Sequence, residues 1–238
     1  MSINYVLFDL DGTLLPMDQE VFIKSYFGRL AAKLAPFGYD PKELISHTWA
    51  GAKAMVKNDG KKTNKDVFWE YFTGVYGEER AAKDMPVFDE FYRIDFDSVK
   101  EDCGFNPEAA PAVRKIRDMG LKVILATNPI IPGMATEHRI RWTGLEPSDF
   151  ELYTTYENSS YAKPNLDYYR EILDKIGAKA EECLMVGNDV DEDMITETLG
   201  MKVFLLTECL INKGGKDISK YPQGGFKELL EYIRSEIL

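Results

Sequence analysis

Two aspartates, Asp9 and Asp11, follow a short apolar run near the start of the chain. The run from Tyr5 to Phe8 is typical of a strand buried on both faces, as in a parallel sheet. Gly12 then allows the backbone to leave the strand in a tight turn. Ligands of α/β proteins bind at the carboxyl ends of such strands, and alternate side chains share one side while a strand stays regular. Two neighbouring carboxylates repel unless a divalent cation or a shared proton is present, so this spacing indicates metal-assisted or acid–base chemistry.

Two other interpretations of this segment are open at first. A strand that ends in a polar turn is common and requires no chemistry. A calcium loop would use the side chains at its positions one, three, five and twelve, which here are Asp9, Asp11, Thr13 and Glu20. That loop also needs a glycine at position six and a preceding helix, whereas Gly12 is at position four and a strand precedes it. We therefore set calcium aside.

Composition narrows the class of protein. The chain has 238 residues, of which 45% are hydrophobic and 29% charged, as in ordinary soluble globular proteins. The formal net charge of -11 is dispersed along the chain, so we expect no nucleic-acid partner. The three cysteines lack metal-ligand spacing and fit a reducing cytoplasm. We see no signal peptide and no stretch long enough to span a membrane, and we expect a cytoplasmic monomer or homodimer with no membrane partner.

The segment from residue 16 to about 100 contains helix patterns and no convincing strand. Phe22, Tyr26, Leu30 and Leu34 recur at four-residue spacing, as on the buried face of a helix. Asp40 and Pro41 resemble an N-cap and a first helical residue, which predicts a helix reaching about residue 57. Further helices are predicted over about 67–77 and 78–101, the latter broken at Pro86.

The rest of the chain alternates between strands and helices. Strands are predicted at 121–126, 152–156, 183–186 and 202–206, with helices at 106–120, 132–142, 165–176, after the acidic loop to 199, and from 226 onward. This order predicts right-handed parallel units, and hence an α/β fold with a doubly wound parallel sheet. The polar residues that follow the strands, including Thr127 and the loop 187–193, should then lie at the same edge as Asp9.

Each of these polar features also has a simple structural explanation. Thr127 could cap a helix, Lys163 could be a solvated surface lysine, and the acidic run Asp189–Asp193 could form the first turn of a helix. Their joint occurrence with Asp9 and Asp11 is much harder to attribute to chance.

The whole pattern resembles the haloacid dehalogenase-like (HAD) superfamily. Asp9-Leu10-Asp11-Gly12-Thr13 looks like its first motif, Thr127 ends a strand as in the second, Lys163-Pro164 is similar to the third, and 187–193 to the fourth. The resemblance implies a Rossmann-like core of residues 1–15 and 103–238, with an all-helical cap inserted at 16–102. One departure is Asn188, which follows Gly187 where many relatives have aspartate. We therefore expect Asp189 to be the fourth-motif metal ligand, with Asp193 in support.

The resemblance also implies an activity. A Mg²⁺ ion would offset the repulsion between a phosphate monoester and a carboxylate nucleophile, which points to a phosphatase acting on a small phosphorylated metabolite. Asp9 would attack phosphorus and form an aspartyl-phosphate, and Asp11 would first protonate the leaving oxygen and then activate water. The expected phosphate-binding residues are Asp9, Gly12, Thr127, Asn128 and Lys163, and the expected metal ligands are Asp9, Asp11 through its carbonyl, Asp189 and Asp193.

Other functions stay open at this stage. A phosphomutase of the same superfamily needs the same core residues as a hydrolase. A receiver-like signalling domain and a non-catalytic protein that binds phosphorylated ligands are alternatives from other classes. Arg29, His47, Trp49 and Lys53 are candidates for substrate contact in the insertion, although surface or packing roles are simpler for each.

Overall fold

The computed structural model describes residues 2–237 and contains one six-stranded parallel sheet. The strand order is β3-β2-β1-β4-β5-β6, so the first strand of the chain lies inside the sheet. Phe8, the last residue of β1, is in register with Leu125 of β2 on one side and Val186 of β4 on the other. The three strands therefore end at one level, as predicted for a shared polar edge. The strands are β1 Tyr5–Phe8, β2 Lys122–Leu125, β3 Leu152–Tyr153, β4 Cys183–Gly187, β5 Lys202–Leu206 and β6 Gln223–Gly224.

Helices cover both faces of the sheet, which confirms the α/β doubly wound architecture. Alternate residues of β1 enter different cores: Val6 and Phe8 pack in one apolar cluster, and Leu7 packs in the other. The first cluster includes Val113 of α5, and the second includes Ile172 of α7. The helices of this part are α5 Ala109–Asp118, α6 Gly133–Trp142, α7 Leu166–Ile176 and α8 Phe226–Tyr232, the last continued by a π-helical stretch, Ile233–Ile237.

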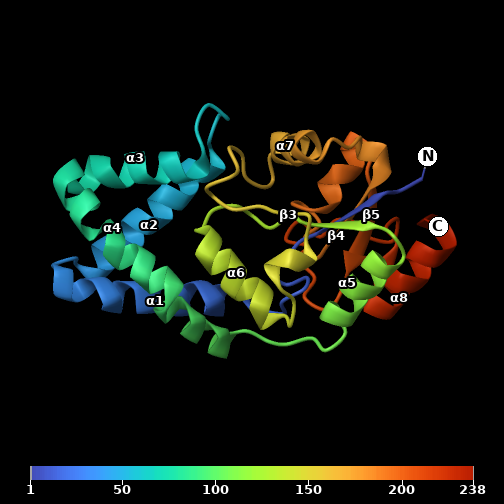
Figure 1. The fold of residues 1–238 in the computed structure, drawn as a ribbon, viewed down its shortest axis with the longest axis horizontal. Helices are drawn as coiled ribbons and strands as arrows, with labels where there is room; N and C mark the ends of the chain where they lie inside the picture. The colour runs from blue at the N-terminus through green and yellow to red at the C-terminus, as the bar shows by residue number, and fades with distance from the viewer. Residues whose placement is uncertain (1, 238) are drawn as a thin grey trace.

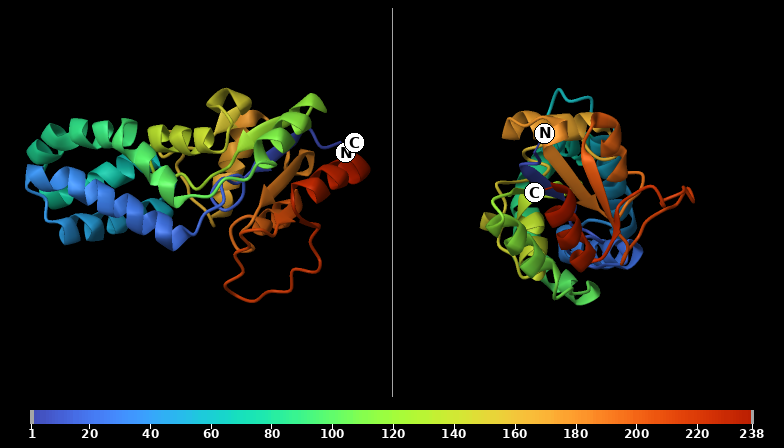
Figure 2. Two further views of the ribbon diagram at one scale, coloured as in Figure 1. Left: turned by 90° about the horizontal axis from the view of Figure 1, so that it is seen from below. Right: turned by 90° about the vertical axis from the view of Figure 1, so that its right-hand side faces the viewer.

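The segment between β1 and α5 forms a separate group of helices at one end of the molecule (Figures 1 and 2). Side-chain caps start three of them: Asp18, Asp40 and Thr63 each accept hydrogen bonds from backbone N–H groups of the first turn. An aromatic cluster around Phe72 of α3 includes Phe68 and Tyr76 of the same helix and Phe88 of α4. The helices are α1 Gln19–Leu34, α2 Pro41–Val56, α3 Asn64–Tyr76 and α4 Glu78–Arg93, followed by a 3₁₀ helix, Asp95–Asp102.

The two connections of this helical segment run side by side. Met17 and Cys103 form an isolated antiparallel bridge, and the Gly104 N–H donates to the Pro16 carbonyl at 2.7 Å. A further polar contact joins α3 to the loops beyond the sheet: the buried Asn64 amide donates to the carbonyls of Pro129 and Tyr161, both at 3.0 Å. The expected boundaries, 16 and 102, fall next to the bridge, and the division into two domains stays a prediction.

Several local expectations need correction. Helix α4 runs through Pro86 without a break. Pro86 has no N–H to donate to the carbonyl four residues earlier, but this residue is exposed, so water can bind that carbonyl instead. The helix expected after the acidic loop is a 3₁₀ helix, Met194–Leu199. Strand β6 was not predicted, since two residues carry no periodic signal. None of the helices described in residues 2–237 is long and apolar enough to cross a membrane.

Phe72 provides a test of the helical packing. Its side chain is completely buried, so Phe72→Ala should lower the free energy of unfolding by about 3–5 kcal/mol. Val75, on the same helix, is 40% exposed, and Val75→Ala should change it by less than about 0.5 kcal/mol. Denaturant unfolding followed by circular dichroism measures both, and similar losses for the two variants would contradict the packing described.

Candidate active site

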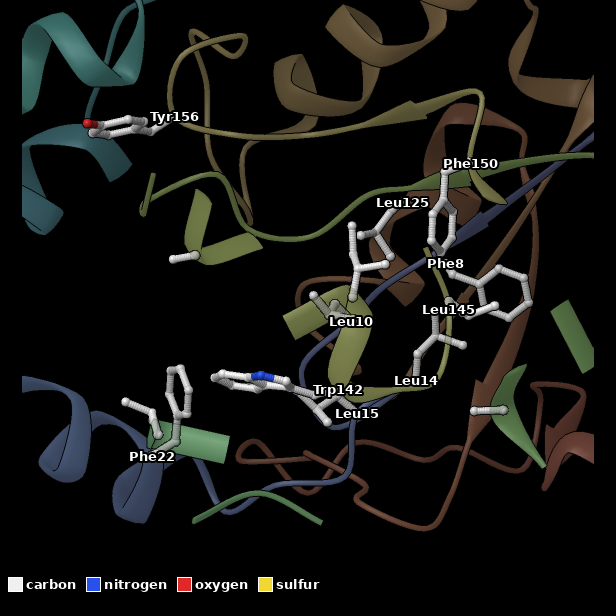
Figure 3. Close-up of a cluster of buried hydrophobic side chains, with 14 of the residues drawn as sticks. Phe8, Leu10, Leu14, Leu15, Phe22, Leu125, Trp142, Leu145, Phe150 and Tyr156 are labelled. Carbon is white, nitrogen blue, oxygen red and sulfur yellow. The ribbon is translucent and has the colours of Figure 1, made fainter. Parts of the chain in front are cut away.

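The turn after β1 is fixed by its backbone and by Leu10. The Asp9 N–H donates to the Val186 carbonyl at 2.9 Å, and the Leu10 carbonyl accepts from the N–H groups of Thr13 and Leu15 at 3.1 and 2.9 Å. The Leu10 side chain is fully buried and points into the apolar cluster with Leu14 (Figure 3). Strand β1 has already ended at Phe8, so the regular alternation expected for the two aspartates does not apply. Both still line one cavity, because Leu10 between them is anchored in the core.

Lys163 is the buried cation of the site. Its ammonium lies 2.7 Å from Asp9 Oδ1 and 2.6 Å from Asp193 Oδ1, and it is only 1% exposed. Burial alone would lower the pKa of Lys163, but the carboxylates of Asp193 and Asp9 outweigh burial and raise it well above its ordinary value. Burial also raises the pKa of Asp193, to about 7, although Lys163 opposes this shift. The alternative of a solvated surface lysine is therefore wrong.

Asp11 is bound by Arg139, a residue that sequence analysis did not identify. The Arg139 guanidinium is buried in α6 and donates to Asp11 Oδ2 and, at 3.2 Å, to the Thr136 hydroxyl. The other oxygen, Asp11 Oδ1, is buried and has no hydrogen-bond partner among residues 2–237. Burial raises the pKa of Asp11, whereas Arg139 lowers it, and the net shift is upward. The sequence contained one signal that could have identified Arg139. It shares the buried side of α6 with Ala135 and Ile140, and a cation on an apolar helix face needs a buried partner.

Thr127 supplies a second unused polar atom. Its side chain is 1% exposed and its hydroxyl has no partner within the described structure. The helix after it, α6, begins only at Gly133, so the alternative role of Thr127 as a helix cap is wrong. Its carbonyl accepts hydrogen bonds from the hydroxyls of Thr154 and Tyr168 at 2.6 and 2.8 Å, which hold the backbone in place. The next residue, Asn128, accepts from the Lys163 N–H at 3.3 Å and lines the cavity.

The loop after β4 places Asp193 beside the sheet. A Cβ on Gly187 would lie 2.1 Å from Asp193 Oδ2, so only glycine permits this approach. Asp193 Oδ2 also accepts from the Asp189 N–H at 3.0 Å. Asp189 in turn uses Oδ1 to accept from the N–H groups of Asp191 and Glu192 at 2.7 and 3.0 Å. The acidic run thus forms a hydrogen-bonded turn before the 3₁₀ helix, and its aspartates organise the loop.

Asn188 has a structural reason to be an amide. Its Nδ2 donates to the Cys209 carbonyl at 2.6 Å, and its Oδ1 accepts from the Thr13 hydroxyl at 3.1 Å. An aspartate there could not donate to the carbonyl. The amide also packs on Gly12, whose φ of +85° favours glycine, and a Cβ on Gly12 would meet Asn188 Nδ2 at 2.3 Å.

The polar residues around Asp9 can be tested for metal binding. Within residues 2–237, no three His, Cys, Asp or Glu side chains are grouped closely enough to hold a metal ion between them. Asp193 already contacts Lys163 through Oδ1 and the Asp189 N–H through Oδ2. Mg²⁺ commonly binds one or two carboxylates and keeps its own waters, and oxygen donors are available from the carboxylates of Asp9 and Asp189 and from the Asp11 carbonyl. The donor chemistry fits Mg²⁺, and the assignment of these ligands stays a prediction.

One cavity brings the site together with the helical segment. It has a volume of about 190 Å³, with Asp9, Asp11, Asp189 and Asp193 on its floor. Side chains of α1 and α2 form the opposite wall. Of the four substrate-contact candidates in the insertion, Trp49 lines the cavity, whereas Arg29, His47 and Lys53 are not among its lining residues.

Comparison with known proteins agrees with this arrangement. The family model described as haloacid dehalogenase-like hydrolase matches residues 3–196. The chain belongs to this family. It is therefore an enzyme of a hydrolase family, which disfavours the receiver-like and non-catalytic alternatives.

Individual relatives of this HAD-like chain are distant. It is 24% identical over 219 residues to the pyrophosphatase PpaX of Halalkalibacterium halodurans, covering 85% of this chain and 82% of that protein. A 2-haloacid dehalogenase from Pseudomonas syringae has a TM-score of 0.63 at 19% identity, with 98% of both chains covered. The HAD hydrolase YfnB of Bacillus subtilis, described as bound to magnesium and as showing interdomain movement, has a TM-score of 0.55 at 16% identity, with both chains fully covered. The fold is thus similar to those of a 2-haloacid dehalogenase and of a HAD hydrolase.

Lys163 should be essential for stability. Lys163→Met leaves two buried carboxylates without a cation, and we expect a loss of about 3–5 kcal/mol in the free energy of unfolding. Adding Asp193→Asn removes one of these charges and should recover part of the loss. Lys220→Met, which breaks an exposed ion pair with Glu197, should leave the unfolding midpoint nearly unchanged. Additive effects of the first two substitutions would contradict the coupling described here.

Proposed function

We propose that this protein is a Mg²⁺-dependent phosphatase that hydrolyses a small phosphorylated metabolite through an aspartyl-phosphate on Asp9. The observation that supports this most is the position of Asp9 on the cavity floor, held by Lys163, with Asp11 beside it. Similarity to the pyrophosphatase PpaX favours phosphoryl chemistry. We also propose a cytoplasmic location, which the free thiols of Cys103, Cys183 and Cys209 favour.

Asp9 is suited to act as the nucleophile. Its Oδ1 is held by Lys163, which leaves Oδ2 to attack phosphorus. The Lys163 ammonium and the unpaired Thr127 hydroxyl would bind phosphoryl oxygens, with help from Gly12 and Asn128. Mg²⁺ bound by Asp9, Asp189 and the Asp11 carbonyl would offset the negative charge of the phosphoryl group.

Asp11 distinguishes phosphatase from dehalogenase chemistry. An alkoxide leaving group needs a proton, whereas a halide leaves without one. The raised pKa of Asp11 favours the protonated carboxyl that a general acid requires, and its unpaired Oδ1 is free to carry that proton. Arg139 would hold Asp11 in place through the other oxygen.

We further propose that residues 16–102 form a cap domain that closes over a core of 1–15 and 103–238. The paired linkers at Met17 and Cys103 would act as the hinge, and closure would exclude water from the reacting groups. A phosphomutase would need the same floor. A hydrolase passes the phosphoryl group of its phosphoenzyme to water, whereas a mutase passes it to a second hydroxyl of the substrate.

Removing the nucleophile tests the central assignment. Asp9→Asn should fold like the wild type and lose essentially all Mg²⁺-dependent phosphate release across a panel of phosphorylated metabolites. Asp174→Asn, an exposed substitution on α7, is the matched control and should keep full activity. Wild-type turnover by Asp9→Asn on every substrate would rule out Asp9 as the nucleophile.

A second experiment separates Asp11 from Asp9. Asp11→Asn should slow transfer of the phosphoryl group from an alkyl phosphate to Asp9 by about 10²–10⁴-fold, because its alkoxide needs a proton. The loss in this step should be much smaller for an acyl phosphate, which has a good leaving group. Rapid-quench measurement of phosphoenzyme formation from the two substrates gives this difference, and equal losses would show that Asp11 is not the acid.

A further inference from the structure

The cavity above Asp9 is divided into a polar floor and an apolar roof. Charged side chains come from the floor, which carries Asp9, Asp11, Asp189 and their neighbours. The roof is formed by α1, α2 and Phe68 of α3, and its side chains are mainly apolar or aromatic. They include Phe22, Ile23, Phe27, Trp49, Met55 and Phe68.

The few polar groups in the roof are already satisfied or exposed. The Tyr26 hydroxyl pairs with the Tyr92 hydroxyl, and the Thr48 hydroxyl donates to the Leu44 carbonyl at 2.8 Å. Gln19 lies at the exposed start of α1. A substrate hydroxyl that entered the roof would therefore lose its bonds to water and find few partners, which is unfavourable.

Cations are equally scarce around the cavity. Among the described residues that line it, Arg139 is the only one with a cationic side chain, and Asp11 occupies it. Lys163, beneath the floor, is shared between Asp9 and Asp193. Two of the three basic residues of α1 are in ion pairs, Arg29 with Glu101 at 3.2 Å and Lys33 with Glu90 at 2.8 Å. The third, Lys24, is exposed and does not line the cavity. A second phosphate group would be buried without a counter-ion.

From this arrangement we propose that the leaving group is apolar, and that the substrate class is the monophosphates of alkyl or arylalkyl alcohols. This inference rests on the proposed phosphatase activity and names its substrate class. In the reaction a bond forms between Asp9 Oδ2 and phosphorus as the bond between phosphorus and the alcohol oxygen breaks, and the alcohol leaves with a proton from Asp11. Water then attacks the aspartyl-phosphate, one of its protons passes to Asp11, and phosphate leaves Asp9. The products are the free alcohol and inorganic phosphate. Pyrophosphate, bisphosphates and sugar phosphates are disfavoured.

The proposal is tested by comparing substrates whose leaving groups differ in polarity. We expect kcat/KM for 2-phenylethyl phosphate to exceed that for glycerol 1-phosphate and for pyrophosphate by at least 10-fold, since a single methylene in an apolar pocket contributes about 10–200-fold. The acetyl group of acetyl phosphate is too small to make much contact with the roof. Phosphate release from this compound therefore measures the phosphatase activity independently of the proposed substrate class. Release from acetyl phosphate together with equal or better use of glycerol 1-phosphate or pyrophosphate would overturn the substrate class and leave the phosphatase assignment intact. No release from any of the four would overturn both.

A charge placed in the roof provides a second test. Ile23→Lys puts an ammonium among the apolar side chains and should lower the preference for 2-phenylethyl phosphate over pyrophosphate by at least 10-fold. Val21, on the same helix, is 47% exposed and does not line the cavity, so Val21→Lys should leave that preference unchanged. Both substrates are assayed on the same preparation, so a partly unfolded variant alters both rates but not their ratio. An unchanged ratio in Ile23→Lys would overturn the proposal.

Discussion

The site depends on one buried cation between two carboxylates. Lys163 contacts Asp9 and Asp193, and these three residues come from the segments that follow β1, precede α7 and follow β4. A buried charge without a partner costs several kcal/mol, so none of the three segments can move away from the others cheaply. The position of Asp9 is therefore set by a residue 154 positions further along the chain. In the proposed reaction the ammonium that stabilises the fold would also bind phosphoryl oxygens.

The sheet provides the frame for this contact. Because β1 is in register with β2 and β4, the chain leaves all three strands at one level, and Asp9, Thr127 and the acidic loop start from neighbouring points. Leu10 then fixes the turn by entering the apolar core. Burial of Leu10 thus positions the turn that carries the charged groups. The ion pairs of Lys163 then determine which loops are held together, which apolar burial alone would not specify.

Much of this could be predicted from the sequence, because strand and helix periodicity report burial directly. Strand β5 was predicted with the observed bounds, and Asp40 was predicted as a cap that the structure confirms. Partnerships between distant residues were not predictable. Nothing local to Arg139 indicates that Asp11 lies beside it, and nothing near Pro86 shows that this residue faces water. Such features depend on the packed structure, whereas motifs identify residue types and their order along the chain.

The floor and the roof of the cavity face different physical demands. The floor must hold several negative charges close together, so it needs fixed cationic partners such as Lys163 and Arg139. It also needs an amide at Asn188, because a carboxylate at that position could not donate to the Cys209 carbonyl. In the proposed reaction the roof would meet only the part of the substrate that leaves, and its side chains could vary without disturbing those partners. The proposal therefore assigns selectivity in this chain to α1 and α2, where apolar side chains face the charged floor.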